Sequence, residues 1–141
     1  MTIENDAELR QILSAATTVA SVGVSSNPDK PSYGIFQYLS EAGYRMIPVN
    51  PTTPEIRGVR TYPDLKSVPG KIDVVQVFRK PEDVPPVVVQ AIQAGASVVW
   101  MQEGIVNTDA AALAEKAGLK VVMDRCMMKT HQRLFAGLSQ L

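Results

Sequence analysis

Five short apolar runs alternate with helical patterns along the chain, and this alternation constrains its fold more than any other feature. The runs contain the β-branched residues typical of buried strands and span 19–22, 45–50, 72–78, 97–101 and 119–123. Helical patterns are expected at 6–17, 32–42, 82–94, 109–117 and 128–138. Such alternation predicts an α/β, Rossmann-like fold, with a doubly wound, five-stranded parallel sheet and helices on both faces. We expect the strand order 3-2-1-4-5, with the switch point between strands one and four.

A length of 141 residues favours one domain, 1–141, in which 1–17 forms an N-terminal helix and 128–141 a helical tail. Asn5 or Asp6 is expected to cap the first helix, and Thr108 the helix over 109–117. Pro48 interrupts the second run, so we expect it where a missing donor does little harm. The proline-rich segment 51–69 takes the place of a crossover helix, with at most a short helix over 62–69. Long loops in compact domains are often functional.

The stretch 19–34 passes from strand through loop to helix, an arrangement that can hold phosphate. Gly23 permits a tight turn, and Ser32 is a suitable N-cap for the following helix. Free N–H groups and the positive dipole end attract phosphate at a helix start, where Gly34 allows close approach. Hydroxyl donors and a cation come from Ser25, Ser26, Ser32 and Lys30. The alternative is a plain connection without ligand, since the glycines do not form the compact G-x-G-x-x-G fingerprint.

Charge and cysteine content narrow the class of protein. The 14 basic and 14 acidic residues balance to a net charge of zero, which does not favour nucleic acid or an anionic membrane as a partner. The single cysteine excludes an internal disulfide and suits a reducing compartment. No apolar run approaches the roughly 18 residues of a membrane span, and the acidic N-terminus is unlike a signal peptide. We therefore predict a cytoplasmic protein.

The end of the second strand lacks the acidic residue that an NAD enzyme uses to hold the ribose. Asn50 and Pro51 stand there instead, and Arg57 and Arg60 follow in the loop. This combination suits a nucleotide whose ribose carries a phosphate, such as NADP or coenzyme A. The alternative is that Asn50 starts a turn and the two arginines are solvated.

The ends of the third and fourth strands place further candidates at the same edge of the sheet. Phe78 could flank an adenine, and Arg79 or Lys80 could bind phosphate. Met101 ends the fourth strand and is expected at this edge as well. The alternative is a core phenylalanine followed by a solvated turn.

Cys126 and His131 raise the question of nucleophilic catalysis. Five residues separate them, whereas a spacing of three or four would place them on one helical face. Cysteine is also a common buried hydrophobe. One histidine and one cysteine do not complete a typical metal site, so we predict none.

The ordered set of motifs resembles the single-domain CoA-binding proteins, which are similar in fold to the CoA-binding N-terminal domain of the succinyl-CoA synthetase alpha subunit. The first matching segments are Val-Gly-Val-Ser-Ser-Asn-Pro from residue 22 with Lys30-Pro31-Ser32, and Pro-Val-Asn-Pro from residue 48. The later ones are Ile-Asp-Val-Val from residue 72, Val-Phe-Arg-Lys-Pro from residue 77, Val-Trp-Met-Gln from residue 99 with Gly104-Ile105, and Asp-Arg-Cys from residue 124. The resemblance covers nearly the whole chain after the first helix.

The resemblance implies a Rossmann-like domain that binds coenzyme A or an acyl-CoA. The loop from Gly23 to Ser32, which includes Asn27, would hold the pyrophosphate together with Tyr33 and Gly34. Asn50, Pro51 and the loop that carries Arg57 would lie near the adenosine, and Phe78 and Arg79 would line the adenine side. The synthetase's second domain, which bears a phosphorylated histidine, has no counterpart here, so ligase activity does not carry over.

The leading interpretation is a CoA-binding protein without catalysis of its own. One alternative is an NADP-binding oxidoreductase or redox sensor. Another is a small acyl-transfer enzyme that uses Cys126. The sequence leaves the acyl group, the oligomeric state and any protein partner open.

Overall fold

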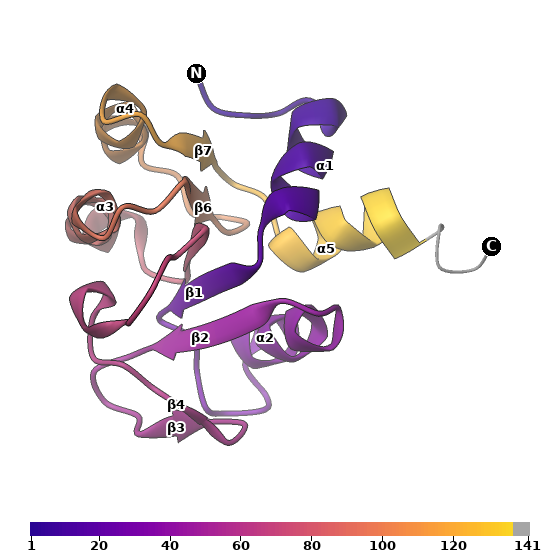
Figure 1. Cartoon of the computed structure of the whole chain (residues 1–141), viewed down its shortest axis with the longest axis vertical. Helices are drawn as coiled ribbons and strands as arrows, with labels where there is room; N and C mark the ends of the chain where they lie inside the picture. Colours follow the sequence, from indigo (N-terminus) through magenta and orange to yellow (C-terminus); the bar gives the residue numbers. More distant parts are fainter. Residues whose placement is uncertain (137–141) are drawn as a thin grey trace.

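Five parallel strands form one sheet in the order β2-β1-β5-β6-β7 in the computed structural model, which describes residues 1–136 (Figure 1). The strands are β1 (Thr18–Val22), β2 (Arg45–Val49), β5 (Val74–Val77), β6 (Val98–Met101) and β7 (Lys120–Val122). All neighbouring pairs in this sheet are parallel. The predicted α/β fold, with a five-stranded, doubly wound parallel sheet, is confirmed.

The predicted strand order is wrong in one respect, the place of the third strand of the sheet. β5 pairs with the side of β1 that β2 leaves free, with Val19 opposite Val74, so the order along the chain is 2-1-3-4-5. The switch point therefore lies between β1 and β5, and not between the first and fourth strands. β2 becomes an edge strand, and this position suits Pro48. The Pro48 carbonyl points away from β1 and accepts from the Tyr62 N–H (3.0 Å). Because the N–H and C=O groups of one strand residue point to the same side, the N–H that proline lacks would also point away from β1.

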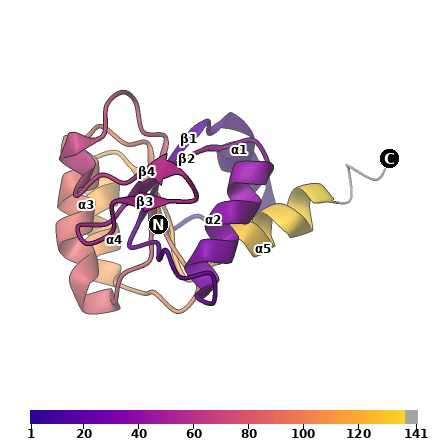
Figure 2. The ribbon, with the colours of Figure 1, turned by 90° about the horizontal axis from the view of Figure 1, so that it is seen from below.

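Helices cover both faces of the sheet, as Figure 2 shows. On one face lie α1 (Asp6–Ala15), α2 (Pro31–Glu41) and α5 (Met127–His131), and on the other lie α3 (Val84–Gln93) and α4 (Thr108–Lys116). Alternate strand residues supply the two cores: Val19 and Val74 face the first group of helices, and Ala20 and Val75 face the second. A short 3₁₀ turn, Pro81–Asp83, precedes α3, and a π-helical turn, Gln132–Ala136, follows α5.

The proline-rich segment after β2 contains a small hairpin that the sequence analysis did not predict. Its strands are β3 (Glu55–Ile56) and β4 (Val59–Arg60), joined by Arg57 and Gly58 with φ of 53° and 78°. Positive φ values at both central residues are typical of the two-residue hairpin turn whose twist agrees with that of the two strands. Ile56 anchors the hairpin in the core beside α2. The expected short helix over 62–69 is confirmed as the 3₁₀ turn Leu65–Ser67.

Two of the predicted helix caps are wrong by one or two residues. α2 begins at Pro31 after Lys30, because proline suits the first helical position, and Ser32 lies inside the first turn. Asn107 caps α4, with its side chain accepting from the Ala110 N–H (2.9 Å), and Thr108 is the first helical residue. Asn5 caps α1 as expected. Of the predicted C-terminal helix over 128–138, positions 137 and 138 lie outside the described residues.

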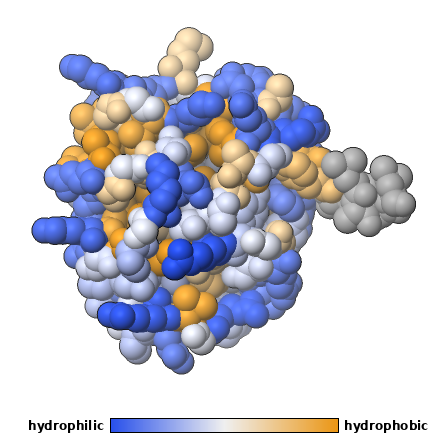
Figure 3. Space-filling view, viewed as in Figure 1, coloured by the Kyte–Doolittle hydropathy of each residue, from blue (hydrophilic) through white to orange (hydrophobic). Residues whose placement is uncertain are grey.

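The surface mixes charged and apolar side chains. Apolar surface gathers over α3 and α4 in Figure 3, where Val89 and Leu113 are exposed. Across residues 1–136, no helix combines the length and the apolar composition needed to cross a membrane.

Candidate functional site

A pocket of about 510 Å³ opens at the carboxyl edge of the sheet, beside the start of α2. In parallel α/β folds ligands bind beyond this edge, at a switch point. Four segments enclose the pocket: the first turn of α2, the end of β5, the loop after β6 and the start of α5. Its lining residues are Pro31, Gly34, Ile35, Phe78, Gln102, Glu103, Ile105, Cys126, Met128 and Lys129. The walls are mostly apolar, with polar groups from the loop after β6 and from α5.

The β1–α2 loop takes its shape from its own side chains. The Ser32 Oγ accepts from the Ser25 N–H (2.9 Å), and the Ser25 Oγ accepts from the Asn27 N–H (3.0 Å). The Asn27 Oδ1 in turn accepts from the Asp29 N–H (2.9 Å). These side chains therefore position the loop, and each serine keeps its hydroxyl proton for a ligand. Ser26 lies exposed in the same loop.

Gly23 is required where the β1–α2 loop passes the end of β5. Its φ is 90°, and a Cβ atom placed on it would lie 2.4 Å from the Phe78 carbonyl oxygen. The Gly23 N–H donates to the Val49 carbonyl (2.9 Å), which ties the turn to β2 as well. The tight turn predicted at Gly23 is confirmed, and its physical reason is the close contact of two backbones.

Gly34 differs from Gly23, because it faces open space. A Cβ atom on Gly34 would meet no atom within 4 Å, and the residue lines the pocket. Tyr33 precedes it, half-buried, and donates its backbone N–H to the Lys30 carbonyl (3.1 Å). The first turn of α2 thus presents bare backbone to the pocket at the positive end of the helix dipole.

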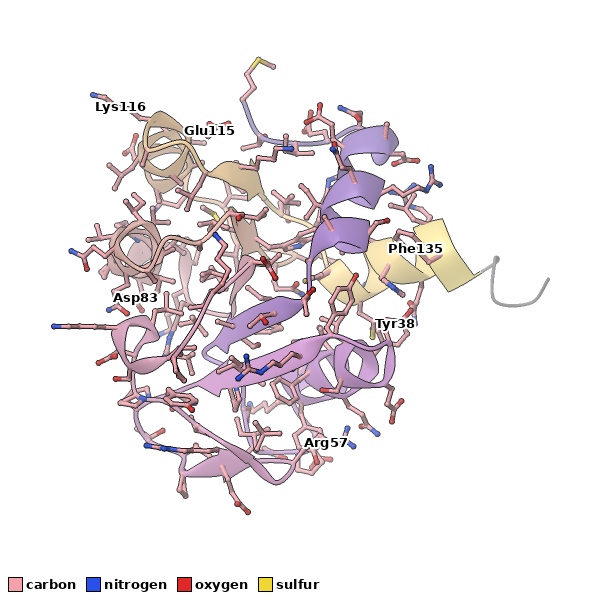
Figure 4. All side chains as sticks on the ribbon, viewed as in Figure 1. Tyr38, Arg57, Asp83, Glu115, Lys116 and Phe135 are labelled. Carbon is pink, nitrogen blue, oxygen red and sulfur yellow. The ribbon has the colours of Figure 1, made fainter. Side chains whose placement is uncertain are left out.

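Cations without carboxylate partners gather around this edge. Lys30, Arg79 and Lys80 follow the ends of β1 and β5, and Arg57 lies at the turn of the hairpin (Figure 4). The ion pairs among residues 1–136 join Met1 to Glu115, Lys129 to Glu103 and Arg133 to Asp6, so none of them neutralises these four groups. Arg60, by contrast, lies over the Tyr62 ring, with its guanidinium 5.1 Å from the ring centroid. The edge can therefore attract an anion with several charges.

Asn50 holds two loops together. Its Nδ2 donates to the Val24 carbonyl (3.0 Å), and its Oδ1 accepts from the backbone N–H and the hydroxyl of Thr52 (2.9 Å each). Pro51 lies exposed in the turn between Asn50 and Thr52. Asn50 thus starts a turn, as the alternative interpretation had it, and its amide positions the β1–α2 loop against β2.

Met101 does not reach the pocket, whereas its neighbour Gln102 does. Met101 is 0% exposed, and its side chain packs in the core beneath α3 and α4. The prediction that the Met101 side chain contributes to a binding site at this edge is therefore wrong. Strand alternation turns Phe78 and Gln102 to the other face, where both line the pocket. The sequence could have identified Gln102 in two ways: it follows Met101, so its side chain points to the other face of the sheet, and it is a polar residue at the end of an apolar run.

Cys126 and His131 do not form a nucleophile–base pair. Cys126 lines the pocket at the start of α5, whereas the His131 Nδ1 lies 2.7 Å from the Tyr38 hydroxyl of α2, and its ring stacks on Phe135. Figure 4 shows Tyr38 and Phe135 on the α2 and α5 side of the molecule. Burial lowers the pKa of His131 and raises the pKa of Tyr44, whose ring also meets that of His131, to about 12. In the part of the chain that the structure describes, no three His, Cys, Asp or Glu side chains come together as metal ligands.

The fold is of the α/β, Rossmann-like type, and comparison with known proteins identifies the family. The family model described as CoA binding domain matches residues 17–132. The chain therefore belongs to the CoA-binding domain family, and the resemblance noted in the sequence is confirmed.

Individual proteins are similar to this chain over most of its length. The uncharacterized protein YneT of Bacillus subtilis is 39% identical over 125 residues, which cover 89% of this chain and 93% of YneT. A solved structure of a hypothetical protein from Pyrococcus horikoshii has a TM-score of 0.91 at 40% identity, with 95% of this chain and 96% of that chain covered. The alpha subunit of ADP-forming acetate–CoA ligase II of Pyrococcus furiosus is 28% identical over 131 residues, or 84% of this chain. The match spans 29% of that ligase subunit, so this chain corresponds to one part of a larger protein there.

Proposed function

We propose that this protein binds coenzyme A or an acyl-CoA at the carboxyl edge of its sheet, without catalysing a reaction of its own. The observation that carries the proposal is the first turn of α2, which borders an open pocket within the segment matched by the CoA-binding family model. The absence of a side chain at Gly34 lets phosphate oxygens approach the backbone there.

The ligand would lie across the edge of the sheet with its pyrophosphate at the β1–α2 loop. Ser25, Ser26 and Lys30 would supply donors, and Arg79 would approach from the end of β5. Arg57, on the hairpin beside β2, would meet the 3′-phosphate of the adenosine. The mostly apolar pocket on the other side suits the pantetheine arm, which is largely aliphatic. Phe78 lines that pocket, so we assign it to the arm and no longer to the adenine.

Binding without catalysis is supported by the surroundings of Cys126 and by the span of the match. The histidine that could serve as a base is held by Tyr38. The ligase relative is more than three times as long as its matching segment, so its activity belongs to a larger protein. We therefore propose a role in carrying, sensing or sequestering CoA for a partner.

Calorimetric titration of CoA, dephospho-CoA and NADP into the purified protein tests this proposal. CoA is expected to bind, dephospho-CoA to bind more weakly and NADP to bind least. At a concentration a hundredfold above its dissociation constant, CoA would stabilise the native state by about 2.7 kcal/mol. NADP that binds more tightly than CoA would replace the proposal by the oxidoreductase alternative, and turnover of an acyl-CoA thioester by the protein would replace it by the acyl-transfer alternative.

A further inference from the structure

Cys126 lies in the same pocket as the start of α2. It is the single cysteine of the chain, and it retains 6% exposure, at the pocket wall. Pro31 and Gly34 line the same pocket, at the proposed phosphate site. A ligand with its phosphates at α2 and an arm in the pocket can therefore bring that arm to the wall that Cys126 lines.

A second observation in the pocket points independently to a ligand. Gln102 is only 3% exposed, and its Oε1 accepts from the Gln76 Nε2 (3.1 Å) and from the Met127 N–H (3.0 Å). Because the Met127 N–H can only donate, this atom must be the oxygen, and the amide nitrogen is the other polar end of the side chain.

The Gln102 Nε2 has no acceptor among residues 1–136, and it is not one of the fully enclosed unpaired atoms. It therefore reaches the wall of the pocket that Gln102 lines. This donor has no protein partner at the pocket wall, so a ligand that brings an acceptor into the pocket can pair with it. The pantetheine arm carries amide carbonyls of this kind and ends in a sulfur.

We propose that Cys126 is a thiol–disulfide exchange site that takes the symmetrical disulfide of coenzyme A. The inference rests on the proposed function, because the CoA half of that disulfide would be held by the α2 site while its sulfur meets Cys126. The product is a mixed disulfide between the protein and one CoA. This adduct reports that the protein has been exposed to oxidised CoA.

The exchange balances without a further oxidant. Cys126 loses its thiol proton to solvent, and the thiolate Sγ attacks one sulfur of the CoA disulfide. A new S–S bond forms between Sγ and that sulfur, while the original S–S bond breaks. The second CoA leaves as a thiolate with the electron pair and takes up a proton from solvent. An added dithiol reverses the step and releases the bound CoA.

Recognition should make this reaction selective among disulfides. A CoA disulfide bound by its phosphates presents its sulfur to Cys126 at a high effective concentration, whereas glutathione disulfide lacks the nucleotide. We expect modification to be at least about tenfold faster with the CoA disulfide at equal concentrations. Once the native structure is lost, Cys126 should react with both at similar rates.

The experiment follows adduct formation on the reduced, full-length protein by intact-mass spectrometry. CoA disulfide and glutathione disulfide are compared at equal concentration for the parent, Cys126→Ser and Gly34→Val. The expected result is one CoA added to the parent, none to Cys126→Ser, and loss of the preference for the CoA disulfide in Gly34→Val. Circular dichroism verifies that each variant is folded, and the parent in urea provides the unfolded reference rate.

The outcomes separate this inference from the proposed function. If CoA binds the parent in the calorimeter but native Cys126 reacts no faster with CoA disulfide than with glutathione disulfide, the exchange site is wrong and the binding site stands. A preference that persists in Gly34→Val also overturns the inference, since recognition then does not pass through α2. If CoA does not bind the parent at all, the proposed function fails first.

Discussion

The two edges of the central sheet each hold a cavity, of about 510 Å³ at the carboxyl edge and about 550 Å³ at the amino edge. The amino-edge cavity is lined by the end of α1, the starts of β5 and β6 and the turns after α3 and α4, including Gly95 and Gly118. Size alone would slightly favour this second cavity as the binding site. The chemistry of the two edges favours the first.

The helix directions explain the difference. In this fold the helices begin at the carboxyl edge and end at the amino edge, so N–H groups face one cavity and carbonyl groups face the other. The carboxylate at the amino edge already has its partners: the Asp73 Oδ2 accepts from the N–H groups of Thr17 and Thr18 (2.9 Å each). Cations occur at both edges: Lys120 lines the amino-edge cavity, and Lys71 donates its Nζ to the Gly95 carbonyl there (2.7 Å). The helix N-termini, which lie at the carboxyl edge, are therefore what favours a polyanion at that edge, although the cavities are alike in volume.

The largest effect is expected from Gly34→Val, which would place a branched side chain in the carboxyl-edge pocket. Lost charge-assisted contacts from backbone N–H groups to phosphate cost about 1.5–3 kcal/mol each. Losing two would weaken CoA binding by about a hundredfold or more. The fold should be retained, because a Cβ at this position meets nothing. Calorimetric titration measures the affinity, with circular dichroism as the folding control.

The matched control for Gly34→Val is Ala15→Val, which adds a branched side chain beside the amino-edge cavity. CoA affinity should be unchanged in this variant. The assignment of the two edges breaks down if Ala15→Val weakens binding as strongly as Gly34→Val does.

The second prediction compares two glycines with positive φ, one at each edge. Gly23→Ala combines a left-handed conformation with a Cβ 2.4 Å from the Phe78 carbonyl, whereas Gly118 (φ 94°) has open space around it. We expect Gly118→Ala to lower the free energy of unfolding by about 1–2 kcal/mol, from strain alone. Gly23→Ala should cost clearly more, in urea titrations of both variants. Equal losses would mean that the loop after β1 can move away from β5.

The third prediction concerns Asp73→Ala, which should affect stability and spare the ligand. Two backbone N–H groups, those of Thr17 and Thr18, would lose their acceptor, at a cost of about 1–3 kcal/mol in the free energy of unfolding. The Kd for CoA should stay that of the parent. A change in Kd without loss of stability would place part of the ligand at the amino edge.

A smaller effect is expected from Arg57→Ala. Arg57 is exposed at the hairpin turn, so its contact with the 3′-phosphate would contribute about 1 kcal/mol or less and weaken with salt. The variant should bind CoA and dephospho-CoA with equal affinity. A persistent preference for CoA would assign the 3′-phosphate to another cation.

The smallest effect is a pH dependence at His131, which helps to hold α5 behind the carboxyl-edge pocket. Burial lowers the pKa of His131 below the ordinary value of 6.5, so in that region the unfolded chain binds more protons than the native protein. The free energy of unfolding should therefore fall as the pH drops through 6.5, until His131 is protonated in the native state as well. Urea titrations of the parent and His131→Gln between pH 5 and pH 8 measure this difference. If the two proteins show parallel pH profiles, His131 does not contribute.

The local pattern of the sequence determined the elements and much of the site. Runs of β-branched residues identified all five strands of the main sheet, because a strand buried on both faces needs an apolar residue at nearly every position. The strand–loop–helix over 19–34 identified the carboxyl-edge pocket that Gly34 lines, and Gly23 marked the tight turn beside it. The family could be recognised from the same motifs.

Only the tertiary structure decided which strands are neighbours and which side chains share the pocket. Strand order depends on pairing between segments far apart in the chain, and the 51–73 segment connects β2 to β5 on the other side of β1. The hairpin at Arg57 depends on Ile56 reaching the core beside α2. Gln102, Cys126 and Gly34 come from three segments whose local sequence carries no information about one another. They meet in one pocket because parallel strands bring their carboxyl ends to a common edge.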